Sequence, residues 1–447
     1  MLAVIVATVH TVLRVWVIFG PGMGGPSAAD EVRFHLPVIE RFSTAWPAVD
    51  LSDYPAAATP GHHLALALLD HIASPSIEVM RLISGVPITL LLALLVWWCA
   101  QRVGALAACA LALPLACSPH TFAFSALVLP ESTSWCLVGA VLILACSRGF
   151  GIKAACVGGL LLLASAGVRQ LTLWCAAPLW TAAWLSGAPL RTHATRVLPE
   201  RLFPIDAPRA RGVRTGLAVA CTLPAFALIA WFVRLWGGLV PPTFQSREAA
   251  DAVAGGVVNQ GFSPSAPAFM LCILGAAGVA FAPTLLRPGL DRLRTVVRWA
   301  LVGGAFGLIV SLIPATSYDM DAGRWSGLWN VANRLPTLAD RSLFITGGAV
   351  LGGMVCGACV ITMPVTRVRW VLLAALTASM AAHITGAQMF QRYIEPLLLI
   401  ILPLAVAGAY EEREDAPPRW SLLGPVALAG ALLVLTIGRV GGTAPVS

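Results

Sequence analysis

Charged side chains are scarce in this chain of 447 residues, where Asp, Glu, Lys and Arg make up only 11% and lysine occurs once, at position 153. A soluble domain normally contains about 25% charged residues, so a soluble protein is not indicated. The sequence also lacks a phosphate-binding loop, a zinc motif of the HExxH type and a GxGxxG loop after a strand. The use of nucleotides is therefore not indicated. We interpret the net charge of +8 as a signal of membrane topology, with no nucleic acid as partner.

Hydrophobic residues make up 58% of the chain, and they gather in runs of the length that crosses a bilayer, about 20 residues of helix. We therefore predict an all-α polytopic membrane protein with eleven to thirteen transmembrane helices, a single integral membrane domain over residues 1–447. The stretch 60–75 is too short and too polar at its ends to span, and we expect an interfacial helix there. The predicted segments are 1–20, 79–100, 104–118, 132–147, 152–168, 171–187, 215–236, 266–285, 299–315, 342–363, 369–386, 394–410 and 420–438.

The distribution of charge predicts which loops share a side of the membrane. With a cytoplasmic N-terminus, seventeen basic residues fall on the cytoplasmic side and eleven on the other, whereas fourteen of the 21 acids fall outside. A cytoplasmic excess of basic residues is the expected bias. This orientation makes 188–214 a basic cytoplasmic loop. It makes 21–78 a large first extracytoplasmic loop with interfacial helices, and 315–341 another extracytoplasmic loop.

Polar residues concentrate on the extracytoplasmic side. The first loop contains Asp30, Glu31 and four of the eight histidines, and smaller polar groups follow at 168–170, 317–325 and 391–396. Loops brought together by a helical scaffold commonly form a functional site. An enzyme for a lipid-linked substrate and a transporter both suit a membrane location. A transporter places its polar residues near the midplane, often in repeated halves. We find no such repeat, so the pattern favours the enzyme.

Five segments carry a resemblance to a known family. They are "DEVRFHLPVIERF" at 30–42, "AATPG" at 57–61, "VRQLTLW" at 168–174, "MDAGRWSGLW" at 320–329 and "FQRYIEPLLLI" at 390–400. In this order they resemble the D-E-x-x-F-H-x-P, T-T-P-P-G, R-Q-T-N, A-D-N-R-H-Y and E-x-R-Y-x-x-x-P segments of the dolichyl-phosphate-glucose α-1,2-glucosyltransferase family. More broadly, an early acidic pair in a large first external loop is typical of the GT-C superfamily.

The resemblance implies a GT-C-type helical bundle and an inverting transfer of a sugar from a polyprenyl-phosphate donor to a lipid-linked or envelope glycan acceptor. The chain departs from the pattern where GRW replaces NRH at 323–325 and where the Asn of R-Q-T-N is missing. These departures concern sugar and acceptor specificity. The scarcity of lysine is typical of a GC-rich bacterial genome, which places the protein in the inner membrane with a periplasmic or exterior site. A eukaryotic chain would face the lumen of the endoplasmic reticulum.

The chemistry of such a transfer assigns roles to particular residues. A carboxylate takes the proton of an acceptor hydroxyl, and we assign this role to Asp30, with Glu31 second. Guanidinium groups bind phosphate in a bidentate manner. The candidates for the phosphate are Arg169, Arg324 and Arg392, and the other candidates for substrate binding are His35, Gln170, Asp321 and Tyr393. We predict no certain cofactor, and a divalent metal is not indicated.

Each assignment has a structural alternative. Asp30 suits the start of a helix near Val32, and Arg169 suits a helix end whose side chain reaches the interface. In that case Arg324 would pair with Asp321, and Arg392 with Glu395, and the two ion pairs would hold loops together. For the whole protein, the alternatives are a transporter or flippase of a lipid-linked sugar, and a scaffold subunit of an envelope complex.

Overall fold

The computed structural model describes residues 2–147, 149–186, 208–246, 261–364, 366–413 and 415–441. Each of the thirteen predicted apolar segments coincides with an α-helix. The predicted cytoplasmic loop 188–214 lies largely outside the described residues. The helices of the apolar segments are α1 (Leu2–Phe19), α5 (Ile77–Val103), α6 (Ala105–Cys117), α8 (Pro130–Cys146), α9 (Ile152–Val168), α10 (Ala176–Leu185), α11 (Pro208–Trp236), α13 (Ala266–Leu286), α14 (Leu293–Leu312), α16 (Leu343–Thr362), α17 (Thr366–Ile384), α18 (Glu395–Tyr410) and α19 (Leu423–Ile437).

The helices make this an all-α protein with the features of an integral membrane protein. Among the described residues, five helices are long and apolar enough to cross a membrane, or six if α6 and α7 (Pro119–Ala126), which meet at a bend of 72°, form one broken span. Shorter apolar helices, among them α8, α9 and α18, accompany them. Most of the buried apolar side chains of the described residues form one continuous core, and Val240 and Phe244 form a small separate cluster. Helix α18 is buried along its whole length, so the segment before it is held firmly.

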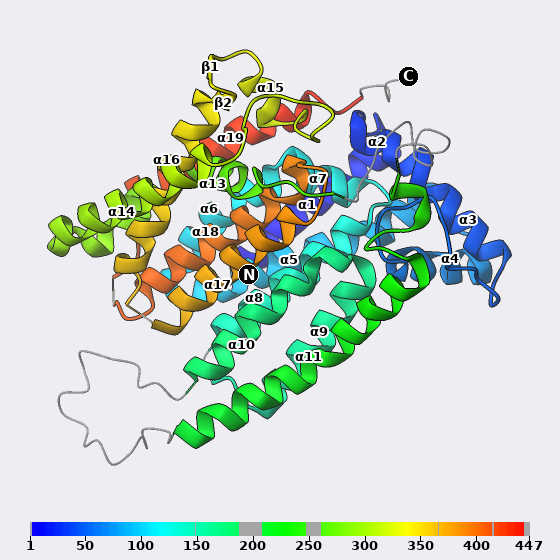
Figure 1. Cartoon of the computed structure of the whole chain (residues 1–447), viewed down its shortest axis with the longest axis horizontal. Coiled ribbons are helices and arrows are strands. Elements are labelled where there is room, and N and C mark those ends of the chain that lie inside the picture. Colours follow the sequence, from blue (N-terminus) through cyan, green and yellow to red (C-terminus); the bar gives the residue numbers. More distant parts are fainter. Residues whose placement is uncertain are drawn as a thin grey trace.

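Helices α13, α14 and α16 form a closely packed group (Figure 1). Gly303 and Gly307 of α14 face Gly353 and Gly357 of α16, and a Cβ added at any of the four would overlap backbone of the other helix. Small residues spaced four apart let two helices approach closely in a membrane. This contact therefore depends on glycine.

The first loop, predicted over 21–78, folds into short helices at one end of the molecule (Figure 1). They are α2 (Pro26–Asp30), the π-helix η1 (Glu31–His35), α3 (Leu36–Thr44) and α4 (Gly61–Ala73). Helix α4 confirms that a helix forms within 60–75. A β-bridge between Met23 and Val440 ties the start of this loop to the end of α19.

The loop predicted over 315–341 contains α15 (Leu328–Ala332) and a hairpin of β1 (Thr337–Leu338) and β2 (Arg341–Ser342), paired antiparallel with Thr337 opposite Ser342. This loop docks on the segment before α18. The indole Nε1 of Trp329 donates to the carbonyl of Met389 over 3.2 Å, and the Leu328 amide donates to the Gln391 side chain over 2.9 Å. The segment 389–391 is thereby tied to the 315–341 loop.

Candidate functional site

A polar pocket of about 460 Å³ lies where these loops meet. Its volume falls in the range of about 300–1,000 Å³ typical of small-molecule sites. Segments predicted to share one face of the membrane therefore do come together here. The charged or ionisable residues that line it are Asp30, His35, His120, Glu131, Arg169, Arg392, Tyr393 and Arg439.

The π-helix explains how the first loop faces the pocket. Asp30 ends α2 and the helix continues directly into η1, so Asp30 caps no helix, contrary to the alternative of a helix start near Val32. The Leu36 amide donates to the Glu31 carbonyl, five residues back. In such a wide turn, residues five apart lie nearly above one another, whereas in an α-helix they diverge. Asp30 and His35, five apart, consequently line the same pocket.

Arg392 connects the two ends of the sequence at this pocket. Its guanidinium donates to the Asp30 carboxylate and, over 3.0 Å, to the Tyr393 hydroxyl. The Asp30 and Arg392 side chains are 24% and 16% exposed, so the pair is accessible from the pocket. The contact of Arg392 with Asp30 differs from the pairing with Glu395 considered above. The Glu395 carboxylate instead accepts hydrogen bonds from Ser118 and Gln391.

A second ion pair lies beside the first. Arg169 donates to Glu131 Oε1 over 2.9 Å, and its guanidinium carbon lies 4.2 Å from the centre of the Tyr393 ring. Arg169 directly follows α9, where the helix gives way to the 3₁₀ turn η2 (Gln170–Cys175). The described residues offer no hydrogen-bond partner to Glu131 Oε2, although Glu131 is only 4% exposed. One carboxylate oxygen of the pocket lining is therefore buried without a hydrogen-bond partner among the described residues.

Three histidines form a cluster next to the pocket, and one of them, His35, lines it. His35 Nδ1 lies 2.9 Å from His63 Nε2, with the rings stacked, and His62 Nδ1 lies 3.3 Å from the Thr133 hydroxyl. Burial lowers the pKa of His35 to about 3, an effect that Arg392 and Arg169 reinforce and Glu131 opposes. Burial likewise lowers the pKa of His62 to about 4 and that of His63 well below its usual value. All three are therefore neutral at pH 7, and His35 meets the pocket as a neutral hydrogen-bonding group.

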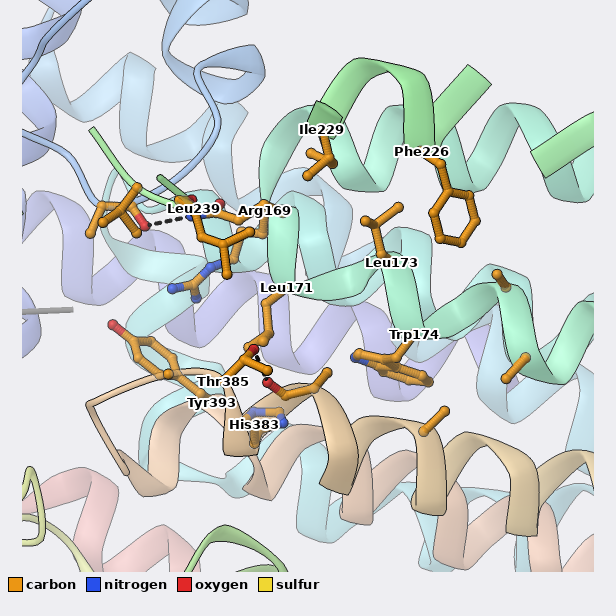
Figure 2. Close-up of a pocket in the computed structure, with 18 of the residues that line it drawn as sticks. Arg169, Leu171, Leu173, Trp174, Phe226, Ile229, Leu239, His383, Thr385 and Tyr393 are labelled. Carbon is orange, nitrogen blue, oxygen red and sulfur yellow. Dashed lines mark hydrogen bonds between the residues drawn. The ribbon is translucent and has the colours of Figure 1, made fainter. Parts of the chain in front are cut away.

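An apolar pocket of about 450 Å³ adjoins the polar one and shares Ala57, Arg169 and Tyr393 with it. Figure 2 shows Arg169 and Tyr393 at one end, and Trp174 and Phe226 farther along. The walls are side chains of η2 and of α10, α11 and α17, which correspond to predicted membrane segments. A charged end that opens into an apolar cavity between helices suits an amphipathic molecule with one polar head and a chain.

Glu31, the second candidate for the base, lies outside both pockets among the described residues. Its carboxylate is fully buried, accepts two hydrogen bonds from Arg81 at 3.0 and 2.6 Å, and accepts a third from the Val128 amide at 2.7 Å. These contacts use both oxygens. The position favours a structural role for Glu31, although it directly follows Asp30.

Three other candidates also lie outside the polar pocket. Arg324 is buried and donates to the Asp319 carboxylate over 3.0 Å and to the Ala315 carbonyl. It therefore holds its own loop together, with Asp319 in the place expected for Asp321. Asp321 is exposed and lines neither pocket. Gln170 lines the apolar pocket, where its amide ties together the backbone at Ala57, Thr59 and Leu239.

Sequence reasoning did not assign Glu131, His120 or Arg439 to the site. Glu131 follows a proline in the first turn of α8, where an acidic residue commonly begins a helix. Their proximity depends on tertiary contacts between segments hundreds of residues apart, which cannot be inferred from the local sequence.

Comparisons with protein-family models, with curated proteins and with solved structures find no match to this chain.

Proposed function

We propose that the protein is an inverting glycosyltransferase that moves a sugar from a polyprenyl-phosphate donor to a lipid-linked or envelope glycan acceptor on the extracytoplasmic face. The observation that supports this most is the junction of the two pockets. An apolar cavity between membrane helices meets a polar pocket at Arg169 and Tyr393, and the polar pocket contains Asp30. An amphipathic donor needs such a junction, because its chain and its phosphate require different surroundings.

The donor would bind across this junction. Its isoprenoid chain would occupy the apolar pocket between α10, α11 and α17, and its phosphate would lie at Arg169, with Arg392 close by. Both guanidinium groups contact Tyr393, so a phosphate there would be within reach of both. The sugar would then lie in the polar pocket beside Asp30.

The chemistry follows from these positions. Asp30 would take the proton of the acceptor hydroxyl, whose oxygen attacks the anomeric carbon while the bond from that carbon to the phosphate oxygen breaks. The leaving polyprenyl phosphate gains negative charge, which Arg169 and Arg392 would stabilise. Arg392 also holds the Asp30 carboxylate in place. Neutral His35 is positioned to orient the hydroxyl. Among the described residues, no group of three His, Cys, Asp or Glu side chains lies close enough together to hold a metal ion.

A flippase of a lipid-linked sugar is the second candidate, favoured by one feature. Helices α6 and α7 meet at a bend of 72°, and Ser118 at this bend donates to Glu395 over 2.6 Å. Broken helices with polar groups at the break are characteristic of many transporters.

An assay of the purified protein with a radiolabelled polyprenyl-phosphate hexose and membrane lipid acceptors distinguishes a glycosyltransferase from a flippase. A transferase releases polyprenyl phosphate and labels the acceptor. We expect Asp30→Asn to lower the rate about 10²–10⁴-fold, since it removes the general base. Asp321→Asn is the matched control, because Asp321 is exposed outside both pockets.

Normal turnover by a folded Asp30→Asn variant would show that the base is assigned incorrectly. Movement of the labelled lipid across liposomes without bond cleavage would instead support the flippase.

A further inference from the structure

Two tryptophans of the 315–341 loop, four residues apart, have different surroundings. Trp329 is fully buried, its ring stacks on Phe269 with the centroids 4.5 Å apart, and its indole Nε1 donates to the Met389 carbonyl. Trp325 is only partly buried and lines the polar pocket. Among the described residues, its indole Nε1 has no hydrogen-bond partner. Trp329 therefore holds the loop in place, whereas Trp325 is available to a ligand in the pocket.

The Trp325 ring has a single aromatic neighbour in the part of the chain that the structure describes. This neighbour is Phe390, whose ring centre lies 5.1 Å away at an interplanar angle of 89°. In an edge-to-face contact of this kind, one ring points its edge at the other. Phe390 consequently covers at most one face of the indole, and the other face is free of aromatic contacts.

The backbone next to Trp325 fixes where this ring lies. Asp319 and Arg324 form an isolated antiparallel bridge and exchange both backbone hydrogen bonds, at 3.1 and 2.8 Å. Gly323 has a positive φ of 70°, which favours glycine, and its carbonyl accepts from the Met389 amide over 3.1 Å. The turn that leads to Trp325 is thus tied to the segment before α18.

A short chain of contacts links Trp325 to the candidate base. The Arg392 guanidinium carbon lies 4.9 Å from the centre of the Phe390 ring, and the same guanidinium donates to the Asp30 carboxylate. Only two side chains therefore separate Trp325 from Asp30. Asn330, which can bind hydroxyl groups, lines the same pocket. A ligand that contacts both the ring and the carboxylate needs an apolar face together with hydroxyl groups.

We propose that Trp325 is a platform for a pyranose ring, which stacks a face of C–H groups on the indole and turns its hydroxyl groups to the polar side chains. The face of an aromatic ring is negative and attracts such hydrogens, and stacking removes apolar surface from water. The family pattern that the sequence resembles has His where GRW places Trp325, so the platform is a feature of this chain.

Under the proposed function this sugar belongs to the donor or to the acceptor. Those two words rest on the proposed function, but the sugar site itself does not.

Binding measurements on the full-length protein in lipid nanodiscs, without glycoside detergents, test this proposal. The probes are methyl β-glucoside, methyl β-galactoside and methyl α-mannoside, with sorbitol as a polyol that has no ring, and saturation-transfer NMR gives the affinities. The variants are Trp325→Leu, Trp325→Phe and Trp420→Leu. Trp420 is the matched control, because it is 59% exposed and lies outside both pockets. Thermal melting establishes that each variant is folded.

We expect Trp325→Leu to weaken binding of at least one glycoside about tenfold, because the stacked aromatic surface is lost. Trp325→Phe should weaken it less, because a smaller aromatic face remains. Sorbitol should bind equally to all variants.

A polyprenyl-phosphate hexose and the bare polyprenyl phosphate then distinguish the two sources of the sugar. If the sugar is that of the donor, Trp325→Leu removes the affinity that the hexose adds to the lipid phosphate. If the sugar is that of the acceptor, this added affinity persists while the glycosides bind more weakly.

Unchanged glycoside affinity in folded Trp325→Leu would overturn the proposal, as would an equal loss in Trp420→Leu or in Trp325→Phe. Failure of all three glycosides to bind the wild type would also overturn it. If glycosides bind through Trp325 and polyprenyl phosphate does not bind the wild type, the sugar site stands and the proposed function fails. If Trp325→Leu transfers sugar with unchanged KM for donor and acceptor, the proposed function stands and the sugar site fails.

Discussion

Two regions of the molecule are built in opposite ways. The group of α13, α14 and α16 packs through glycines, backbone against backbone. The loop cluster around α2 and η1 is held by ion pairs and hydrogen bonds between side chains distant in sequence, such as Glu31 with Arg81 and Asp30 with Arg392. The first arrangement brings the helix backbones into direct contact. The second leaves charged groups beside a pocket, so chemistry is expected there.

The largest effect on stability is expected at Glu31 in the loop cluster. Glu31→Gln removes the charge that faces Arg81 and should lower the free energy of unfolding by about 3 kcal/mol, the low end for a buried pair because Arg81 retains some contact with water. Chemical denaturation in detergent measures this. Glu40→Gln is the control, because Glu40 is exposed.

The same variant distinguishes the role of Glu31 from that of its neighbour Asp30. Glu31→Gln should leave the transfer rate per folded molecule near the wild-type value, whereas Asp30→Asn should not. Loss of turnover in both folded variants would mean that the structural role inferred for Glu31 is incomplete.

The glycine contact should be disturbed by one methyl group. Gly353→Ala places a Cβ against the Gly303 carbonyl and should cost about 1–3 kcal/mol, because two backbones must separate. Gly347→Ala, in the same helix, meets nothing within 4 Å. That control should be neutral or slightly stabilising. Equal melting temperatures for the two variants would contradict the packing described for α14 and α16.

The smallest effect per residue concerns pH. His35, His62 and His63 stay neutral in the folded protein, because burial is the main factor that lowers their pKa values. The unfolded chain takes up protons below pH 6.5, so stability falls with pH from about 6.5 to 4, by about 1.4 kcal/mol per histidine at pH 5.5. The apparent melting temperature should drop between pH 7.5 and 5.5, and less so in His62→Gln. An equal drop in that variant would assign the acid sensitivity to other groups.

The sequence predicts the helices well and the site only in part. Long apolar runs predict all thirteen helical segments, whereas among the described residues five or six spans are long and apolar enough to cross a membrane. Asp30, His35, Arg169, Arg392 and Tyr393 share the polar pocket as expected. The sequence does not reveal the π-helix that turns Asp30 and Glu31 to different surroundings. Nor does it reveal the pairing of Glu131 with Arg169, or Arg439 at the far end of the chain, because these depend on tertiary contacts.

The central claim is that a lipid phosphate binds where the two pockets meet. An experimental density map of the protein with bound polyprenyl phosphate tests it most directly. We predict the phosphate within hydrogen-bonding distance of Arg169, the chain between α10, α11 and α17, and Asp30 in the open pocket beyond. A phosphate bound elsewhere, with the apolar pocket empty and Asp30 out of reach of the ligand, would contradict the account.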